Sequence, residues 1–294
     1  MKKIGMVGVG LMGHGIASNI VKHGHSLAVL EHAGNQPIDD LKAKGVRTFT
    51  TASDLAAEVD ILILCVTGSP QVEAVLLADD GALKGLRPGT VVIDCSTAIP
   101  SSTERLARTV SEAGGRFMDA AMTRTPKEAA EGRLNLLVGA DEALFAELRP
   151  LLACFAENIT HAGAVGAGHR MKLLHNYVSL GSVALIAEAA ACAARADIAP
   201  EVLVDVLAKG GGGGIALERL KPFLLSQDAS GLRFAMSNAL KDLGYYATMA
   251  EDSGAARAIA NGVRATFERA VQEGDPQALV PELVTLLQQR GDGN

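Results

Sequence analysis

Three glycines near the start of the chain follow the spacing GxGxxG, which is typical of a dinucleotide-binding turn. After a hydrophobic segment and before a helical one, the chain runs Gly8-Val9-Gly10-Leu11-Met12-Gly13. The first glycine permits a tight turn, the second lets the backbone approach a pyrophosphate, and the third lets the helix pack close to the strand. The helix N-terminus then faces the anion. We therefore predict a dinucleotide site here, although methyltransferases carry similar loops.

Glu31 ends the next strand-like segment, where a carboxylate can accept hydrogen bonds from the ribose hydroxyls of a dinucleotide. The same carboxylate repels the 2′-phosphate of NADP, and the residue that follows is His32, not the arginine that would attract it. The sequence therefore predicts NAD in preference to NADP. The alternative is a surface glutamate that contacts no ligand.

Lys172 and Asn176 are four residues apart in a helical segment, so they share one helix face and can act on one substrate. Oxidation of an alcohol needs a group that takes the hydroxyl proton as the hydride leaves. A lysine enclosed beside a positively charged nicotinamide releases its own proton more readily and can then act as that base. By itself, Lys172 fits an ordinary helix-surface lysine better than a catalytic one.

Alternating strands and helices must position these residues in the first part of the chain. Helical segments such as Gly13–His23 and Ser101–Ala113 separate short β-rich runs, which predicts a Rossmann-type, doubly wound parallel sheet. The strands are expected at Lys3–Val7, Leu27–Glu31, Ile61–Val66, Thr90–Cys95, Arg116–Asp119, Leu134–Val138 and Asn158–His161. Two of them end in Val66-Thr67 and Ser96-Thr97, at the sheet edge where ligands bind in open α/β folds.

After about residue 164 the strand pattern disappears and the chain is expected to be helical. Proline and glycine breaks predict helices at roughly 168–196, 200–209, 215–226, 234–252, 254–273 and 280–290. We therefore expect a Rossmann domain over residues 1–163 and an all-helical domain over residues 164–294 that begins with a long helix. The Gly210–Gly214 run is expected either to approach a ligand or to be a plain connection.

Composition excludes several classes of function. A net charge of −6, no Trp and only three Tyr make nucleic-acid binding an unlikely role. The apolar run Val178–Ala194 contains Glu188 and is shorter than the about 20 residues that cross a bilayer, so no membrane span is expected. Cys65, Cys95, Cys154 and Cys192 lack metal-ligand spacing, which predicts no metal site and buried free thiols of a cytoplasmic protein.

Several separated motifs in one order resemble the β-hydroxyacid dehydrogenase family, which includes 3-hydroxyisobutyrate dehydrogenase and tartronate semialdehyde reductase. After the glycine turn the chain has Met12-Gly13-His14-Gly15-Ile16-Ala17-Ser18-Asn19-Ile20, similar to the family's MGxxMAxNL. Asp94-Cys95-Ser96-Thr97 and Asp119-Ala120 follow, and Gly166–Asn176 is similar to GxGxxxKxxNN. The match closes with Lys241-Asp242-Leu243-Gly244.

The resemblance implies a Rossmann domain joined by a long helix to an all-helical domain, with the active site in the cleft between them. It implies a homodimer or homotetramer and a small anionic substrate. It makes Lys172 the catalytic lysine, with Asn176 orienting the same oxygen, and places Lys241 beside nicotinamide and substrate. The alternative for Lys241 is an ion pair with Asp242 or Glu251. Val66, Thr67, Ser96 and Thr97 are implied to contact ribose and nicotinamide, the alternative being simple strand ends.

The predicted substrate loop departs from the family pattern. Most members have Asp-Ala-Pro-Val-Ser-Gly-Gly, whereas this chain has Asp119-Ala120-Ala121-Met122-Thr123-Arg124-Thr125. Thr123 keeps a hydroxyl, while Arg124 and Thr125 replace the glycines. An arginine fork suits a carboxylate, sulfonate or phosphate, and an Arg-Thr pair resembles sulfolactaldehyde reductase. The alternative is an Arg124 that points to solvent or pairs with Glu128. His175 replaces the family's first asparagine.

The leading hypothesis is therefore an NAD-dependent oxidoreductase that interconverts a primary alcohol and an aldehyde on a small 3-hydroxy acid or its semialdehyde. Within that class, sulfolactaldehyde and other semialdehydes stay open as substrates. An imine reductase shares the architecture but does not need the Lys172/Asn176 pair. Two further alternatives come from other classes of protein. A non-catalytic dinucleotide sensor would bind the cofactor without turnover, and a methyltransferase would bind S-adenosylmethionine in place of NAD.

Overall fold

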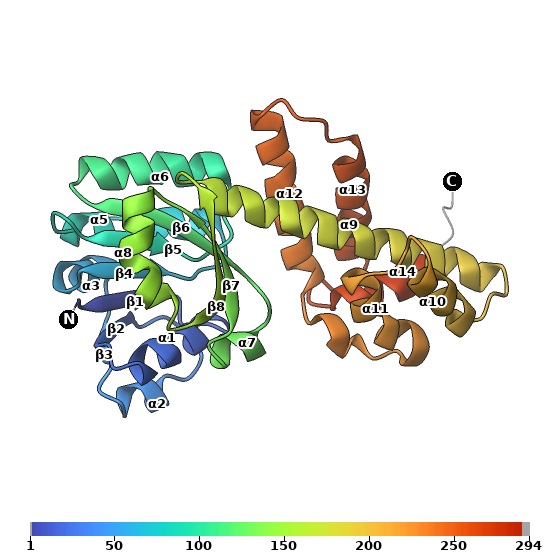
Figure 1. The fold of residues 1–294 in the computed structure, drawn as a ribbon, viewed down its shortest axis with the longest axis horizontal. Helices are drawn as coiled ribbons and strands as arrows, with labels where there is room; N and C mark the ends of the chain where they lie inside the picture. Colours follow the sequence, from blue (N-terminus) through green and yellow to red (C-terminus); the bar gives the residue numbers. More distant parts are fainter. Residues whose placement is uncertain (1, 290–294) are drawn as a thin grey trace. The chain divides into compact units, whose positions relative to one another are not determined.

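A computed structural model describes residues 2–289, and these fold into two compact units that divide between Lys172 and Leu173. The first unit is α/β and the second is helical, as Figure 1 shows by the ribbon and its labels. The predicted fold class, a Rossmann-type sheet followed by an all-helical region, is confirmed.

The first unit contains one eight-stranded sheet in the order β3-β2-β1-β4-β5-β6-β7-β8. All neighbouring strands pair in parallel except β6 and β7, which are antiparallel, so the expectation of a wholly parallel sheet is wrong at this pair. The first six strands have the Rossmann order. The strands are β1 (Ile4–Val7), β2 (Leu27–Leu30), β3 (Arg47–Phe49), β4 (Ile61–Leu64), β5 (Val91–Asp94), β6 (Arg116–Thr123), β7 (Leu134–Gly139) and β8 (Ala156–Gly163).

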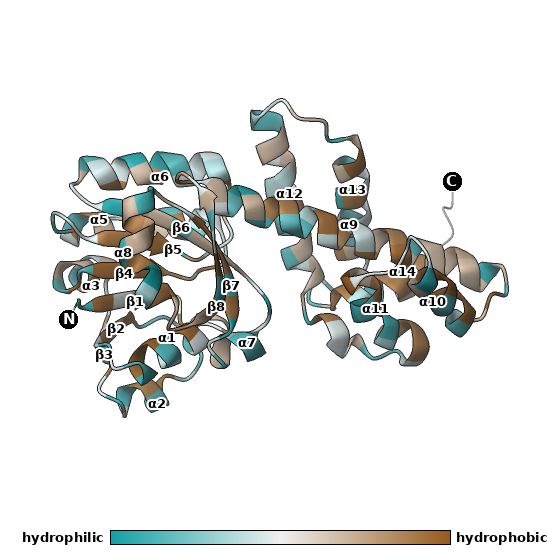
Figure 2. Cartoon of the chain, viewed as in Figure 1, coloured by the Kyte–Doolittle hydropathy of each residue, from teal (hydrophilic) through white to brown (hydrophobic). Residues whose placement is uncertain are grey.

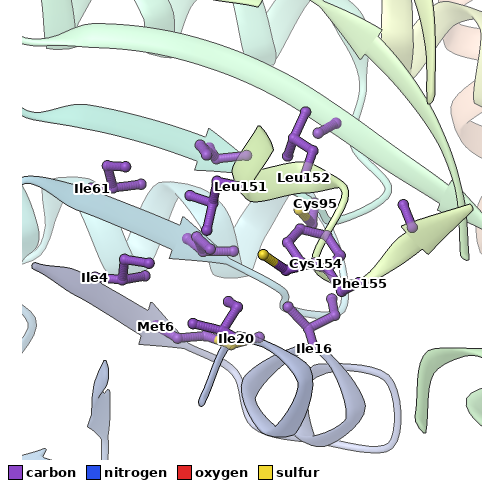
Figure 3. Packing of buried hydrophobic residues seen from close by; sticks show 14 of the residues in the cluster. Ile4, Met6, Ile16, Ile20, Ile61, Cys95, Leu151, Leu152, Cys154 and Phe155 are labelled. Atoms are coloured by element: carbon purple, nitrogen blue, oxygen red, sulfur yellow. The ribbon is translucent and has the colours of Figure 1, made fainter. Parts of the chain in front are cut away.

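Helices cover both faces of this sheet, which is why its central strands are continuous apolar runs. Along β4, Ile61 and Ile63 enter one buried cluster and Leu62 and Leu64 the other, because side chains alternate across a strand. The first cluster includes residues of β1, α1 and α8 (Figure 3), and Figure 2 shows polar residues on α6 and apolar ones on the strands. The helices are α1 (Gly13–Lys22), α2 (Asp39–Lys42), α3 (Ala52–Glu58), α4 (Ser69–Leu77), α5 (Ala82–Gly85), α6 (Pro100–Glu112), α7 (Pro126–Ala130) and α8 (Glu142–Leu152).

The second unit has its own apolar core, built from helices whose bounds lie close to the predicted ones. Leu180 and Val183 of α9 pack there with Phe223 of α11, Met236 of α12 and Phe267 of α13. The exposed Gly210–Gly214 run connects α10 to α11. The helices are α9 (Ala167–Arg195), α10 (Pro200–Lys209), α11 (Ile215–Ser226), η1 (Ala229–Leu232), α12 (Met236–Asp252), α13 (Ala258–Glu273), η2 (Val280–Glu282) and α14 (Leu283–Gln289).

Helix α9 is 29 residues long, so the helix that contains the apolar run 178–194 is long and apolar enough to cross a membrane. The expectation that this segment is too short for a span is therefore wrong by length. Half of its most apolar window is buried inside the structure, as in a core helix of a water-soluble protein. Among the described helices it is the only one that meets the length and composition test.

The four cysteines are free thiols, but they are not all buried as expected. Cys95 and Cys154 are buried, Cys65 is partly buried, and Cys192 is exposed. Cys192 lies three and seven residues after Ala189 and Leu185, which are also exposed, so all three share the outward side of α9. Its apolar sequence neighbourhood reflects the opposite, buried side of the same helix.

Candidate active site

The glycine turn lies between β1 and α1, and its three glycines are required for different reasons. Gly8 has a positive φ of 92°, which favours glycine. A Cβ on Gly13 would lie 1.9 Å from the carbonyl oxygen of Gly8, so α1 could not start so close to β1 with any side chain there. A Cβ on Gly10 would meet nothing nearer than 3.9 Å, which leaves open space over this part of the turn. Leu11 is 67% exposed and Met12 is half-buried against the core.

The segment after β2 is hydrogen-bonded to this turn. The Val9 N–H donates to Oδ1 of Asn35 at 3.1 Å, and the Gln36 N–H donates to the Val9 carbonyl at 2.8 Å. Glu31, at the start of that segment, is exposed, and Nζ of Lys42 donates to its Oε1 at 2.9 Å. The hydrogen bond from Lys42 lowers the pKa of Glu31, so the carboxylate is ionised. An open turn with an ionised acceptor after β2 fits the ribose and pyrophosphate of NAD.

The ends of β4 and β5 are joined by a hydrogen bond between two of the predicted contact residues. The Val66 N–H donates to Oγ of Ser96 at 3.0 Å, and the Ser96 N–H donates to Oδ1 of Asp94 at 2.9 Å. Ser96 is buried, whereas Thr97 is half-buried and Thr67 is exposed. The hydroxyl of Ser96 therefore helps to form this sheet edge, and Thr67 and Thr97 are the more accessible hydroxyls beside it.

Asp119 of β6 attaches the start of α9 to the same edge of the sheet. Its carboxylate accepts the N–H groups of Gly166 at 2.6 Å and His169 at 2.8 Å. Burial raises the pKa of Asp119, while the ring of His169 and these two amides act in the opposite direction. The sequence motif contained Asp119, but its role in holding α9 was not predicted. A carboxylate inside a buried strand was the available signal, because such a group needs partners.

Lys172 and Asn176 both lie on α9, four residues apart as predicted. Lys172 is half-buried and Asn176 is buried. Nδ2 of Asn176 donates to Oδ2 of Asp242 at 2.6 Å, and Nδ1 of His175 lies 3.0 Å from Oδ1 of Asn176. The asparagine side chain is therefore held in one orientation within the second unit.

Asp242 also holds the second candidate lysine. Nζ of Lys241 lies 3.3 Å from Oδ1 of Asp242 and 5.5 Å from the centre of the Tyr245 ring. Asp242 is only 3% exposed, so it links Asn176 of α9 and Lys241 of α12 through a buried carboxylate. Of the two expected ion-pair partners of Lys241, Asp242 is present, whereas Glu251 pairs with Arg257. The bridging role of Asp242 was missed because it depends on a contact between distant helices.

Thr123, Arg124 and Thr125 follow one another at the end of β6, and each side chain already has a partner. Thr123 Oγ accepts from Nδ2 of Asn135 at 3.1 Å, and the Thr125 N–H donates to Oε2 of Glu128 at 3.0 Å. The guanidinium of Arg124 donates to the Arg133 carbonyl and to the carboxylate of Glu157.

The expected alternative that Arg124 pairs with Glu128 is therefore wrong, because Thr125 occupies that carboxylate. The hydrogen bond from the Thr125 hydroxyl lowers the pKa of Glu128. Arg124 also has a positive φ of 81°, which is unusual for a residue with a side chain. Arg124 thus presents its backbone in a conformation that glycine adopts readily.

Two family models together cover almost all of the chain. Residues 3–163 match the NAD-binding domain of 6-phosphogluconate dehydrogenase. Residues 166–287 match the NAD-binding model of NADP-dependent 3-hydroxyisobutyrate dehydrogenase. The chain belongs to the β-hydroxyacid dehydrogenase family. It is an NAD-dependent oxidoreductase that acts on CH–OH groups.

Known β-hydroxyacid dehydrogenases are similar over nearly the whole length. The NAD-dependent L-serine dehydrogenase of Pseudomonas aeruginosa is 31% identical over 93% of this chain and 94% of its own. The 2-(hydroxymethyl)glutarate dehydrogenase of Eubacterium barkeri is 32% identical over 82% of this chain and 80% of its own. The structure of Mycobacterium tuberculosis 3-hydroxyisobutyrate dehydrogenase with L-serine has a TM-score of 0.88, 26% identity, and coverage of 98% of this chain and 99% of its own.

The space around the glycines predicts different results for two alanine substitutions. Gly10→Ala should leave the melting temperature within about 2 °C of wild type, because the added Cβ would meet only the Gly34 carbonyl oxygen at an ordinary contact distance of 3.9 Å, but should weaken NAD binding at least about tenfold. Gly13→Ala should lower the melting temperature by roughly 5 °C or more, because its Cβ overlaps the Gly8 carbonyl. Thermal unfolding and NAD titration measure both effects. Wild-type NAD affinity in Gly10→Ala would contradict the close approach of a pyrophosphate.

Proposed function

We propose that this enzyme interconverts a primary alcohol and an aldehyde on a small 3-hydroxy acid, with Lys172 as the group that moves the proton. In this proposal residues 1–163 bind NAD, and residues 164–294 contribute substrate and subunit contacts. The observation that carries the proposal is the position of Lys172 less than two turns into α9. The start of this helix is bonded by Asp119 to the carboxyl edge of the sheet, where ligands of such sheets bind.

The chemistry needs one proton acceptor and one oriented oxygen. Bound NAD supplies the hydride acceptor, and NADH supplies the hydride in the reverse direction. During oxidation, neutral Nζ of Lys172 takes the hydroxyl proton, and during reduction the ammonium returns a proton to the aldehyde oxygen. Asn176 has a second Nδ2 proton beyond the one that Asp242 accepts, and we assign it to the substrate oxygen.

The names of the relatives support the substrate class. The compounds 2-(hydroxymethyl)glutarate, L-serine and 3-hydroxyisobutyrate each carry a primary alcohol on the carbon next to the one that bears a carboxylate. Oxidation of each alcohol gives a semialdehyde. We therefore assign this chain a substrate with a hydroxymethyl group beside an acid-bearing carbon, and we assign Lys241 a charge contact with the cofactor or the acid.

The acid group of the substrate is assigned to Thr123, Arg124 and Thr125. An arginine fork binds a carboxylate or a sulfonate through two parallel hydrogen bonds, so sulfolactaldehyde is the second candidate substrate. A spectrophotometric screen of NADH oxidation with carboxylated and sulfonated semialdehydes distinguishes the two. Turnover of only the sulfonated compounds would favour the second candidate.

Replacement of the proposed base tests the mechanism directly. Lys172→Ala should reduce turnover about 10²–10⁴-fold, the usual effect of a positioned acid or base, and should leave NAD affinity nearly unchanged. Arg170→Ala is a matched control, because Arg170 is an exposed cation on the same helix that pairs with Glu104. Steady-state kinetics and NAD titration measure the outcome. If Lys172→Ala keeps its turnover, Lys172 is not the proton-transfer group.

Arg124 and its partner Glu157 test the acid contact. Arg124→Ala should raise KM for the acid substrate about ten- to hundredfold with little change in kcat, since hydrogen bonds to charged groups contribute about 1.5–3 kcal/mol. Glu157→Gln removes the carboxylate that holds the guanidinium, so its KM should stay equal or fall. If Arg124 serves only to fix the loop, both variants will lose thermal stability while KM stays unchanged.

We also propose that the enzyme is a homodimer or homotetramer that assembles through the second unit. Its helices expose large apolar side chains, including Leu185 at 66%, Val206 at 63% and Ile215 at 68%. Such exposure is typical of surfaces that another subunit covers. Light scattering should give a particle mass that is a multiple of the 30.4 kDa chain mass. Leu185→Glu should lower this measured particle mass. A monomer mass for the wild type at working concentration would refute this assembly.

A further inference from the structure

Three ionisable side chains meet inside the first unit, beneath the edge where the candidate ligand residues lie. Asp94 ends β5, Asp119 lies in β6 and His169 lies in the first turn of α9, and each is 0% exposed. The proposed proton transfer does not use any of them directly. Two buried carboxylates without a compensating charge would strongly destabilise the fold, so the imidazole between them matters.

Each ring nitrogen of His169 lies within hydrogen-bond distance of one partner. Nε2 lies 3.2 Å from the backbone carbonyl oxygen of Ser96, and a carbonyl can only accept, so Nε2 carries a proton. Nδ1 lies 2.7 Å from Oγ of Thr103, and the same Oγ lies 3.2 Å from the Ile99 carbonyl oxygen. The ring therefore joins the strand end at Ser96 to Thr103 of α6.

The two carboxylates flank the imidazole ring. Oδ2 of Asp94 lies 3.9 Å from Nε2, and Oδ2 of Asp119 lies 4.0 Å from Nδ1. Oδ2 of Asp94 accepts no hydrogen bond from the described residues, so the edge of the imidazole is the polar group beside it. Asp119 has the amides of Gly166 and His169 in addition. The other ionisable groups beside Asp94 are the Cys65 and Cys95 thiols, and burial raises the pKa of both, which keeps them neutral.

We propose that His169 is a positioning residue that fixes the cofactor edge and the proton-transfer lysine to one another. Its Nε2–H holds the carbonyl of Ser96, the residue whose hydroxyl accepts from the Val66 N–H. Its backbone N–H is held by Asp119, and Lys172 follows three residues later on the same helix. Residues three apart lie on neighbouring positions of a helix surface. One imidazole thus couples the strand end at Ser96 to the helix turn that carries Lys172.

The contact between the His169 ring and Ser96 is measured without any substrate. In protein labelled with ¹⁵N in the histidine rings, Nε2 of His169 should resonate as a protonated nitrogen, because its partner is the Ser96 carbonyl oxygen. The signals are assigned by their loss in His169→Gln. An Nε2 without a proton would show that the ring does not hold the Ser96 carbonyl and would overturn the proposal.

The positioning role is measured as a difference between kcat and KM. His169→Gln should lower kcat at least about tenfold while the substrate KM stays within about twofold, because the lysine is misplaced but the acid contact is not. Thr103→Val removes only the partner of Nδ1 and should lower kcat less strongly and shift the Nδ1 resonance. Thr109→Val is the matched control, because Thr109 is a half-buried threonine of α6 with the same 3.2 Å bond to the carbonyl four residues before it.

Two results overturn the positioning role. One is a wild-type kcat in both His169→Gln and Thr103→Val. The other is a loss of kcat in Thr109→Val as large as the loss in Thr103→Val. If His169→Gln does not fold, Thr103→Val and the ring resonances still decide the question. The inference rests on the assignment of Lys172, but the contact between His169 and Ser96 does not, so retained turnover in Lys172→Ala would refute the function while the NMR result stands.

Discussion

The bond between the Asp119 carboxylate and the first amides of α9 is the interaction on which the rest of the candidate site depends. A helix N-terminus carries unpaired N–H groups and a partial positive charge, so a carboxylate there satisfies both. Asp119 is fully buried and accepts from Gly166 and His169, which fixes where and in which direction α9 starts. Lys172 follows within two turns, so its position relative to the sheet edge derives from this contact.

Close approach of the backbone makes this contact possible. A Cβ on Gly168 would lie 2.3 Å from the Leu137 carbonyl and 2.8 Å from Oδ2 of Asp119, so a side chain at this position would push α9 away from the sheet. This explains in physical terms the second glycine of the segment Gly166-Ala167-Gly168. The imidazole of His169 then places its two nitrogens beside the buried carboxylates of Asp94 and Asp119.

Local patterns predicted most of the fold, because strand alternation and glycine or proline breaks act over a few residues. Helices α10 and α11 have the predicted bounds of 200–209 and 215–226. The strand β3 (Arg47–Phe49) was missed, since it is three residues long and has Phe49 as its one large apolar residue. The antiparallel direction of β7 against β6 could not be read locally either. It depends on how the short α7 turns the chain between the two strands.

The candidate site was predictable where spacing along the chain carries the information, as for the glycine turn and for Lys172 with Asn176. It was not predictable where distant segments meet. Asp119 and His169 are 50 residues apart, and Asn176 and Asp242 are 66 apart. A sequence shows that these charged groups lie in apolar surroundings, but only the folded chain shows which partner compensates each of them.

At Arg124 the sequence shows the departure from the family pattern, and the folded chain shows the backbone conformation and the partners of the side chain. Its φ of 81° costs an arginine about 1–2 kcal/mol relative to the usual helical or extended backbone, a cost that the glycine common in the family at this position avoids. The bonds to Glu157 and to the Arg133 carbonyl offset some of this cost, yet a glycine would need no such compensation. The acid contact proposed for the guanidinium would give this conformation a role beyond the stability of the loop.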